Sequence, residues 1–153
     1  MSDSLKDKIT NATKDAMRAR DSARLGTLRL LQAAIKQREV DERIELSDDD
    51  VVTIIDKQIK QRRESIQAYE KAGRSETAAA EQAEIDVLSE FMPEQADAAE
   101  ISALIDDVLA QLSADGISGG AAMGRAMGAI KPKLAGRADM SEVSKILKEK
   151  LNP

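Results

Sequence analysis

Basic side chains gather in the last third of the sequence, close to a row of glycines. Residues 116–153 contain seven basic and three acidic residues, whereas residues 93–115 contain six acidic residues and no basic one. Four of the basic residues lie in or just after a short predicted helix over residues 121–130: Arg125, Lys131, Lys133 and Arg137. Such side chains donate charge-assisted hydrogen bonds to phosphate oxygens. The four residues are therefore the candidate phosphate contacts, and the alternative is a solvated basic face that binds nothing.

The glycines in this segment recur at a helical interval. Gly120, Gly124 and Gly128 are spaced four residues apart, so they share one face of the predicted helix. Each costs roughly 1 kcal/mol relative to alanine inside a helix, and something should offset that cost. The favoured interpretation is close packing, in which a neighbouring helix crosses at the glycines. The alternative is a flat face against which an RNA backbone can lie. No Gly-Lys-Ser or Gly-Lys-Thr follows, which excludes a phosphate-binding loop of the nucleotide-hydrolase type.

Two opposite charges interrupt apolar rows in the first two thirds of the chain. Arg62 occupies a position where the predicted helix over residues 47–71 should present an apolar side chain. Glu84 occupies such a position in the next predicted helix. An unpaired buried charge is strongly destabilising, so the two positions predict a partly buried Arg62–Glu84 ion pair. The alternative is a carboxylate site in which Glu81 and Glu84 bind a metal or perform acid–base chemistry. This carboxylate site is the least favoured interpretation, and we predict no metal site.

The amino-acid composition excludes several kinds of site. The 153 residues include no histidine and no cysteine, and the net charge is −5. Thiol and imidazole nucleophiles, Ser–His triads, disulfides, iron–sulfur clusters and zinc sites built from these residues are therefore ruled out. Phe91 and Tyr69 are the aromatic residues, too few for a platform that stacks bases. No catalytic residue and no cofactor is predicted.

Helix-forming residues and capping signals predict an all-α fold of about seven helices. Polar caps open the predicted helices, and glycines or prolines close several of them. The expected ranges are about 4–18, 21–40, 47–71, 75–92, 97–115, 121–130 and 139–151. A hinge over residues 93–97 is expected to separate an N-terminal subdomain of helical hairpins, residues 1–92, from a C-terminal three-helix bundle, residues 93–153. With no apolar segment of roughly 20 residues and no signal sequence apparent, we expect no membrane association and a cytoplasmic location.

Five segments of the chain match the motifs of a known family. They are Arg24–Leu31 (RLGTLRLL), Lys60–Ile66 (KQRRESI), Glu81–Pro93 (EQAEI…FMP), Met123–Gly128 (MGRAMG) and Gly136–Asp139 (GRAD). In this combination and order the sequence resembles the GatB/YqeY family over essentially its whole length. Met140 departs from the pattern, because that family often has glycine after the aspartate.

The resemblance carries expectations about fold and function. It implies a two-part helical fold similar to the tail of the B subunit of glutamine-dependent tRNA amidotransferases. That tail helps hold tRNA near its elbow while other domains perform the chemistry. Arg125 and Arg137 fall on the family motifs, whereas Lys131 and Lys133 are supported by charge alone. A carbon–nitrogen ligase label with glutamine as amido donor would then express kinship, since the chain has no room for the catalytic domain.

These observations lead to two hypotheses of function. The first is a non-catalytic tRNA-binding accessory module that uses Arg125, Lys131, Lys133 and Arg137. The second is a helical adaptor that docks on an aminoacyl-tRNA synthetase or an amidotransferase, with its helical faces as the interface.

Overall fold

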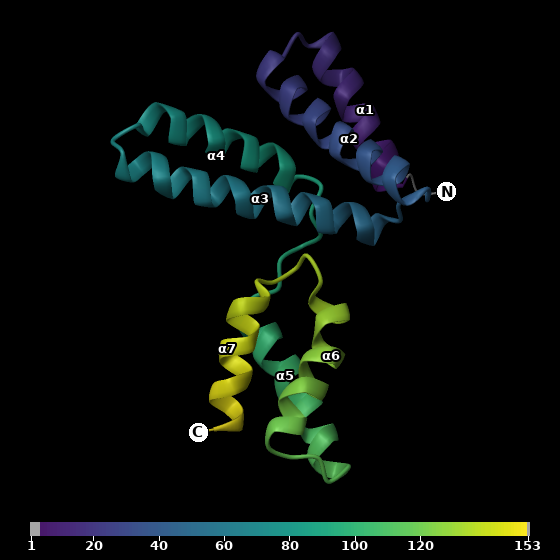
Figure 1. Cartoon of the computed structure of the whole chain (residues 1–153), viewed down its shortest axis with the longest axis vertical. Helices are drawn as coiled ribbons and strands as arrows, with labels where there is room; N and C mark the ends of the chain where they lie inside the picture. Colours follow the sequence, from purple (N-terminus) through teal and green to yellow (C-terminus); the bar gives the residue numbers. More distant parts are fainter. Residues whose placement is uncertain (1–3, 153) are drawn as a thin grey trace. The chain divides into compact units, whose positions relative to one another are not determined.

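The structure is a computed structural model, and it describes residues 4–152. In this part of the chain it contains seven α-helices and no strand, which confirms the all-α class (Figure 1). The helices are α1 (Leu5–Arg18), α2 (Ser22–Glu42), α3 (Asp48–Lys71), α4 (Ser75–Ser89), α5 (Ala98–Ala114), α6 (Gly120–Leu134) and α7 (Met140–Leu151). The outermost residues of the two predicted domains, 1–3 and 153, lie outside the described part. None of the described helices is long and apolar enough to cross a membrane.

The chain divides into two compact units between Met92 and Pro93, at the start of the predicted hinge. The first unit consists of two helical hairpins, α1 with α2 and α3 with α4, and α2 also packs against α4. Its core combines residues from all four helices, including Ile9, Leu28, Leu31, Ile55 and Leu88. Burial of these side chains, at about 1.5 to 3 kcal/mol each, stabilises the unit.

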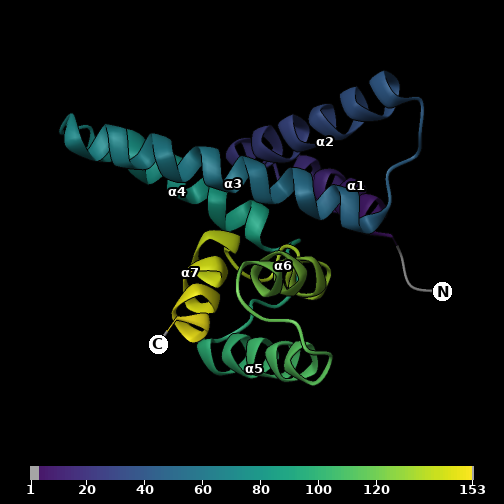
Figure 2. The same cartoon turned by 60° about the horizontal axis from the view of Figure 1, so that its bottom comes forward.

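The second unit is a bundle of three helices, α5, α6 and α7 (Figure 2). Its core contains Ile105 from α5, Ile130 and Leu134 from α6, and Val143 and Leu147 from α7, all of them almost completely buried. The bundle thus fixes which side of α6 faces inward, and by exclusion which side is left for solvent or a ligand.

Local signals explain most helix ends. Ser47 and Asp50 form a reciprocal capping box at the start of α3, and Gly73 adopts a positive φ of 73° just after its end. A residue with a positive φ also follows α1 and α2, but there it is an arginine: Arg20 and Arg43 both have a φ of 56°. These two ends use arginine at a position that glycine fills with less strain.

Two predicted helix ends were wrong. Helix α4 stops at Ser89 instead of Met92, and the chain continues in single turns to the proline. Helix α6 does not stop before Pro132 but continues to Leu134. Proline lacks the N–H that would bond the carbonyl of Gly128, a cost that the burial of Leu134 (1% exposed) helps to offset.

Candidate nucleic-acid interface

Helix α6 has one buried face and one face that carries few side chains. Ala122, Ala126, Ile130 and Leu134 recur every four residues and are buried against α5 and α7. The opposite side carries the glycine row, in which Gly124 and Gly128 are exposed. At a rise of about 1.5 Å per residue, the row from Gly120 to Gly128 extends about 12 Å along the helix.

The glycine row is not a helix crossing. A Cβ atom built on Gly120, Gly124 or Gly128 would have no heavy atom within 4 Å beyond its own helix. The close-packing interpretation of these glycines was therefore wrong. The bundle buries the alanine and isoleucine side of α6, and so the glycines lie on the side away from the neighbouring helices. Their helix-weakening effect, roughly 1 kcal/mol each, is not offset by packing within the described residues.

Three of the four predicted cations remain accessible. Arg125, Lys131 and Lys133 are exposed, and within residues 4–152 none of them forms an ion pair. At about 100° per residue, Lys131 lies almost in line with Gly124, and Arg125 lies to one side of it. Lys133 projects from the far side of the helix relative to Gly124. The structure thus groups Arg125 and Lys131 with the glycines and separates Lys133 from them.

Arg137 has a different environment from the other three. Its guanidinium donates to both carboxylate oxygens of Glu100, at 2.8 and 3.0 Å, and its Nε donates to the carbonyl of Glu94 at 2.8 Å. The backbone carbonyl of Arg137 accepts a hydrogen bond from Ala96 at 2.8 Å. Arg137 therefore holds the turn between α6 and α7 against the start of α5, and its role as a phosphate contact stays a prediction.

The same contact modifies the predicted cap of α5. Asp97 accepts a hydrogen bond from the backbone N–H of Glu100 at 2.7 Å, as expected for a helix N-cap. The carboxylate of Glu100 does not return a hydrogen bond to the backbone of Asp97, which would complete a capping box, because it binds Arg137 instead. Sequence reasoning could not detect this choice, because the two partners are 37 residues apart.

A groove next to the glycine row adds a cation that was not among the four predicted ones. The groove has a volume of about 440 Å³ and lies between the start of α6, with Gly119 as the N-cap and Gly120 in the first turn, and the end of α7. Lys148 lines its α7 side and is exposed. The neighbouring Lys150 is instead paired with Asp106 of α5 at 2.8 Å. The candidate surface, termed the α6 face below, therefore comprises Gly120, Gly124, Gly128, Arg125, Lys131 and Lys148.

Arg62 and Glu84 meet in the first unit, as their positions in the sequence suggested. Nε of Arg62 donates to Oε2 of Glu84 at 3.0 Å, and the two side chains are 14% and 35% exposed. Arg62 also donates to the carbonyl of Gln58 at 3.4 Å. Glu84 is thus engaged in joining α3 to α4, and no group of three acidic side chains arranged to hold a metal occurs among the described residues. This geometry favours the structural role over a carboxylate site.

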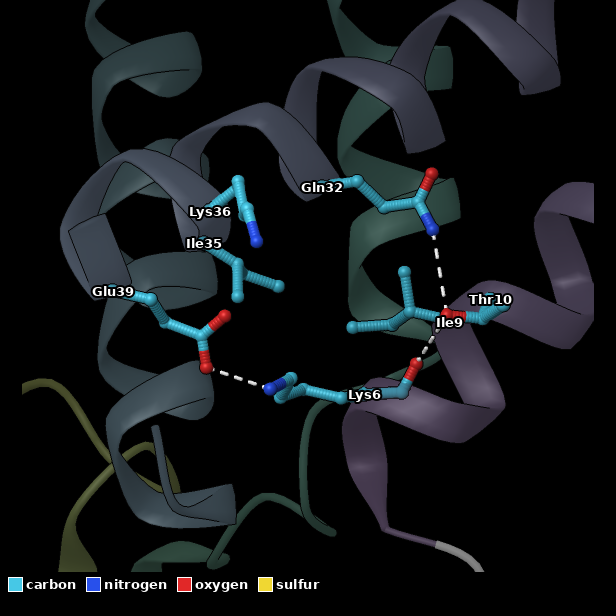
Figure 3. Close-up of a pocket in the computed structure, with 7 residues that line it drawn as sticks. All are labelled: Lys6, Ile9, Thr10, Gln32, Ile35, Lys36 and Glu39. Carbon is cyan, nitrogen blue, oxygen red and sulfur yellow. Dashed lines mark hydrogen bonds and ion pairs between the residues drawn. The ribbon is translucent and has the colours of Figure 1, made fainter. Parts of the chain in front are cut away.

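A small cavity in the first unit lies between α1 and α2 (Figure 3). Its volume is about 210 Å³, and Ile9 and Ile35 form its apolar part. At one end Nζ of Lys6 donates to Oε2 of Glu39 at 2.6 Å. This hydrogen bond, followed by one from the backbone of Leu46, lowers the pKa of Glu39, and the same contact raises the pKa of Lys6. The pair joins α1, α2 and the loop before α3, so its role in the geometry is structural.

Curated relatives of the chain are fungal proteins. A protein of Pyrenophora tritici-repentis, named "Altered inheritance of mitochondria protein 41, mitochondrial", is 35% identical over 89% of this chain and 75% of its own length. Proteins of the same name from Lachancea thermotolerans and Eremothecium gossypii are 32% and 36% identical. The matches cover 72% and 65% of this chain, and 63% and 56% of those relatives.

The names of these relatives bear on the expected location. All three describe mitochondrial proteins. The prediction of a cytoplasmic location, which rested on the lack of a recognisable targeting segment, is corrected by this finding.

A family comparison covers nearly the whole chain. A family model described as "Yqey-like protein" matches residues 6–151, which include most of both units and all five motif segments. This confirms the resemblance seen in the sequence. The chain belongs to the YqeY family.

Proposed function

We propose that this protein is a non-catalytic RNA-binding accessory module that holds folded tRNA through the α6 face. The observation that carries the proposal is a helix face with exposed glycines, open space above them and unpaired cations beside them. A phosphate backbone can approach a helix closely only where side chains do not project. Arg125 and Lys131 are six residues apart, so they can reach different phosphates.

Recognition by this face would depend on the shape and charge of the RNA. The second unit has no aromatic residue, since Tyr69 and Phe91 both belong to the first unit. Base stacking, the usual means of reading single-stranded RNA, is therefore not available to it. Contacts to phosphates carry little sequence information, so the natural ligand of the α6 face is a folded RNA.

The similarity to the amidotransferase tail suggests which RNA and which process. In the proposed role the module binds tRNA near its elbow, and a synthetase or amidotransferase supplies the chemistry. Arg137 has no part in RNA contact under this proposal. It holds the turn after α6 against α5, and the exposed cations of α6 and α7 make the contacts.

A titration of the full-length protein with unmodified tRNA tests the proposal. Binding is measured by fluorescence anisotropy at about 50 mM and about 200 mM salt, because displaced counterions make phosphate contacts salt-dependent. The double variant Arg125→Glu/Lys131→Glu should lose at least about tenfold in affinity and reduce the slope of log K against log salt by about two.

The matched control reverses two charges elsewhere. Lys57→Glu/Arg63→Glu makes the same change in net charge at exposed positions of α3. This control should retain most of the affinity and the salt slope. Equal losses in the two variants would mean that tRNA responds only to total charge and would refute the α6 face as the binding site.

A further inference from the structure

Helix α2 carries exposed apolar residues on the side away from the core. Leu30 is 57% exposed, Val40 is 60% exposed, and Ile44, just after the helix, is 47% exposed. Within α2, Leu30 and Val40 recur with Gly26, Ala33 and Gln37 at intervals of three and four residues, so these five positions form one stripe, and Ile44 follows the left-handed Arg43 just beyond its end. All large apolar side chains that are exposed within residues 4–152 lie in the first hairpin or directly after it, because the fourth is Met17 of α1. A stripe of this kind is unlike the scattered apolar residues of an ordinary surface.

The stripe is additional to the face that α2 uses for folding. Leu28, Leu31 and Ile35 are buried in the core of the first unit. Leu30 and Ala33 therefore lie beside core residues in the sequence but contribute to a second apolar surface. This surface contributes nothing to the core of the unit, and it has the spacing of the contact seam in a helix pair.

A row of basic residues runs along one edge of the stripe. The row consists of Arg29, Lys36 and Arg43, each seven residues from the next. All three are exposed, and within the described residues none forms an ion pair. Some other basic residues of this unit are paired, as Lys6 is with Glu39 and Arg62 with Glu84, whereas Lys57 and Arg63 of α3 form no ion pair within the described residues. Lys36 also lies at the rim of the cavity between α1 and α2 (Figure 3). The helical spacing places Arg29 and Lys36 in the position that flanks the apolar seam of a coiled coil, where charges select the partner, and Arg43 is the left-handed cap at the end of the same helix.

We propose that the outer face of α2 docks an amphipathic helix of a partner protein, one with acidic side chains next to its own apolar stripe. Leu30, Val40 and Ile44 supply the apolar contact. The small residues Gly26 and Ala33 allow close approach, since a Cβ on Gly26 would have nothing within 4 Å. The basic row then pairs with the partner's carboxylates, which fixes its orientation.

The charge pattern argues against a second copy of this chain. In an antiparallel pair of α2 helices, the row of Arg29, Lys36 and Arg43 would lie against itself and repel. In a parallel pair the row would face positions 27, 34 and 41. Of these only Asp41 is acidic, and Thr27 is buried. An acidic partner helix satisfies all three cations, and a second copy does not.

Two synthetic helical peptides test the inference on the full-length protein. Both carry the same leucine seam, but one has glutamate at the flanking positions and the other has lysine. Anisotropy should show binding of the glutamate peptide and at least about tenfold weaker binding of the lysine peptide. Leu30→Asp and Val40→Asp should each weaken the glutamate peptide at least about tenfold. Arg29→Glu/Lys36→Glu should reverse the preference between the peptides.

Matched controls separate docking from loss of folding. Gln67→Asp introduces the same charge at an exposed position of α3 and should leave peptide binding unchanged. Leu30→Ala serves as a second, milder variant if Leu30→Asp lowers the helicity measured by circular dichroism.

Several results would overturn the inference. These are equal binding of the two peptides, no binding of either, or binding that the α2 substitutions do not alter. A dimer seen by light scattering that Leu30→Asp dissociates would assign the face to a second copy. Loss of tRNA binding in Arg29→Glu/Lys36→Glu, without any peptide binding to the unsubstituted protein, would assign it to RNA. Because the inference rests on the first unit alone, it can hold when the α6 face fails to bind tRNA.

Discussion

The outer faces of α2 and α6 are both left uncovered by the unit to which each belongs, but they present opposite surfaces. The α2 face offers branched apolar side chains with a basic edge, and the α6 face offers bare backbone with cations beside it. Within residues 4–152, the cations of neither face form an ion pair. The difference indicates that positive charge alone does not identify a ligand. The residues between the charges decide whether a helix or a phosphate backbone can fit.

The largest expected effect comes from measuring both tRNA binding and peptide binding for variants of each face. Arg125→Glu/Lys131→Glu combined with Lys148→Glu should weaken tRNA binding by about a hundredfold, since about three phosphate contacts are lost. The same variant should leave binding of the glutamate peptide unchanged. Conversely, Leu30→Asp should affect the peptide and not tRNA. If either variant impaired both ligands, the two faces would have to be parts of one site.

The next largest effect concerns the support of the α6 face. Arg137→Ala removes the bonds to Glu100 and Glu94, and should destabilise the second unit by about 1 to 2 kcal/mol after allowance for their exposure. Arg125→Ala, the matched arginine without an internal partner, should leave stability unchanged but weaken tRNA binding. Urea unfolding of the full chain and hydrogen exchange in residues 94–100 provide the readouts. A stable Arg137→Ala protein with weak tRNA binding would return Arg137 to the interface.

A smaller effect compares the exposed glycines of the two helices. Gly26 of α2 and Gly124 of α6 both have open space where a Cβ would be added. Gly26→Ala and Gly124→Ala should therefore each stabilise the protein by about 0.5 to 1 kcal/mol, through the higher helix propensity of alanine. Gly124→Leu should reduce tRNA affinity in addition, whereas Gly26→Leu should reduce peptide affinity. Thermal unfolding would contradict the open-face description if either alanine variant were less stable than the parent.

The smallest effect is a pH dependence in the support of the α2 face. The pKa of Glu39 is lowered by Lys6 and that of Asp50 by the backbone N–H of Ser47. A lowered pKa in the folded state stabilises the protein above the unfolded value, near 4.3 for Glu and 3.9 for Asp, and this stabilisation is lost as the pH falls through the folded value. The first unit should thus lose stability below about pH 4.5.

A variant isolates the contribution of Glu39. Glu39→Gln should flatten the acid limb of the stability profile, and Glu64→Gln at an exposed position of α3 is the matched control. Hydrogen exchange in residues 5–18 and 22–42 reports the hairpin directly. An acid limb that is identical in Glu39→Gln and the parent would show that the Lys6–Glu39 pair does not hold α1 to α2.

The amino-acid sequence by itself determined the class of fold and most of the helix boundaries. Ser47 with Asp50 and Gly73 act through neighbouring backbone groups, and such local effects can be read without a structure. The periodicity of apolar residues likewise located the Arg62–Glu84 pair, because two charges in apolar rows need each other.

The tertiary structure alone decided which candidate residues are free to act. Arg125 and Arg137 are equivalent in the motifs, yet only packing of the turn against α5 shows that Arg137 is occupied by Glu100. The spacing of Gly120, Gly124 and Gly128 fits a helix crossing as well as an open face, and only the orientation of α6 in the bundle distinguishes them. Accessibility depends on which surfaces the folded chain brings together, and residues distant in sequence set it.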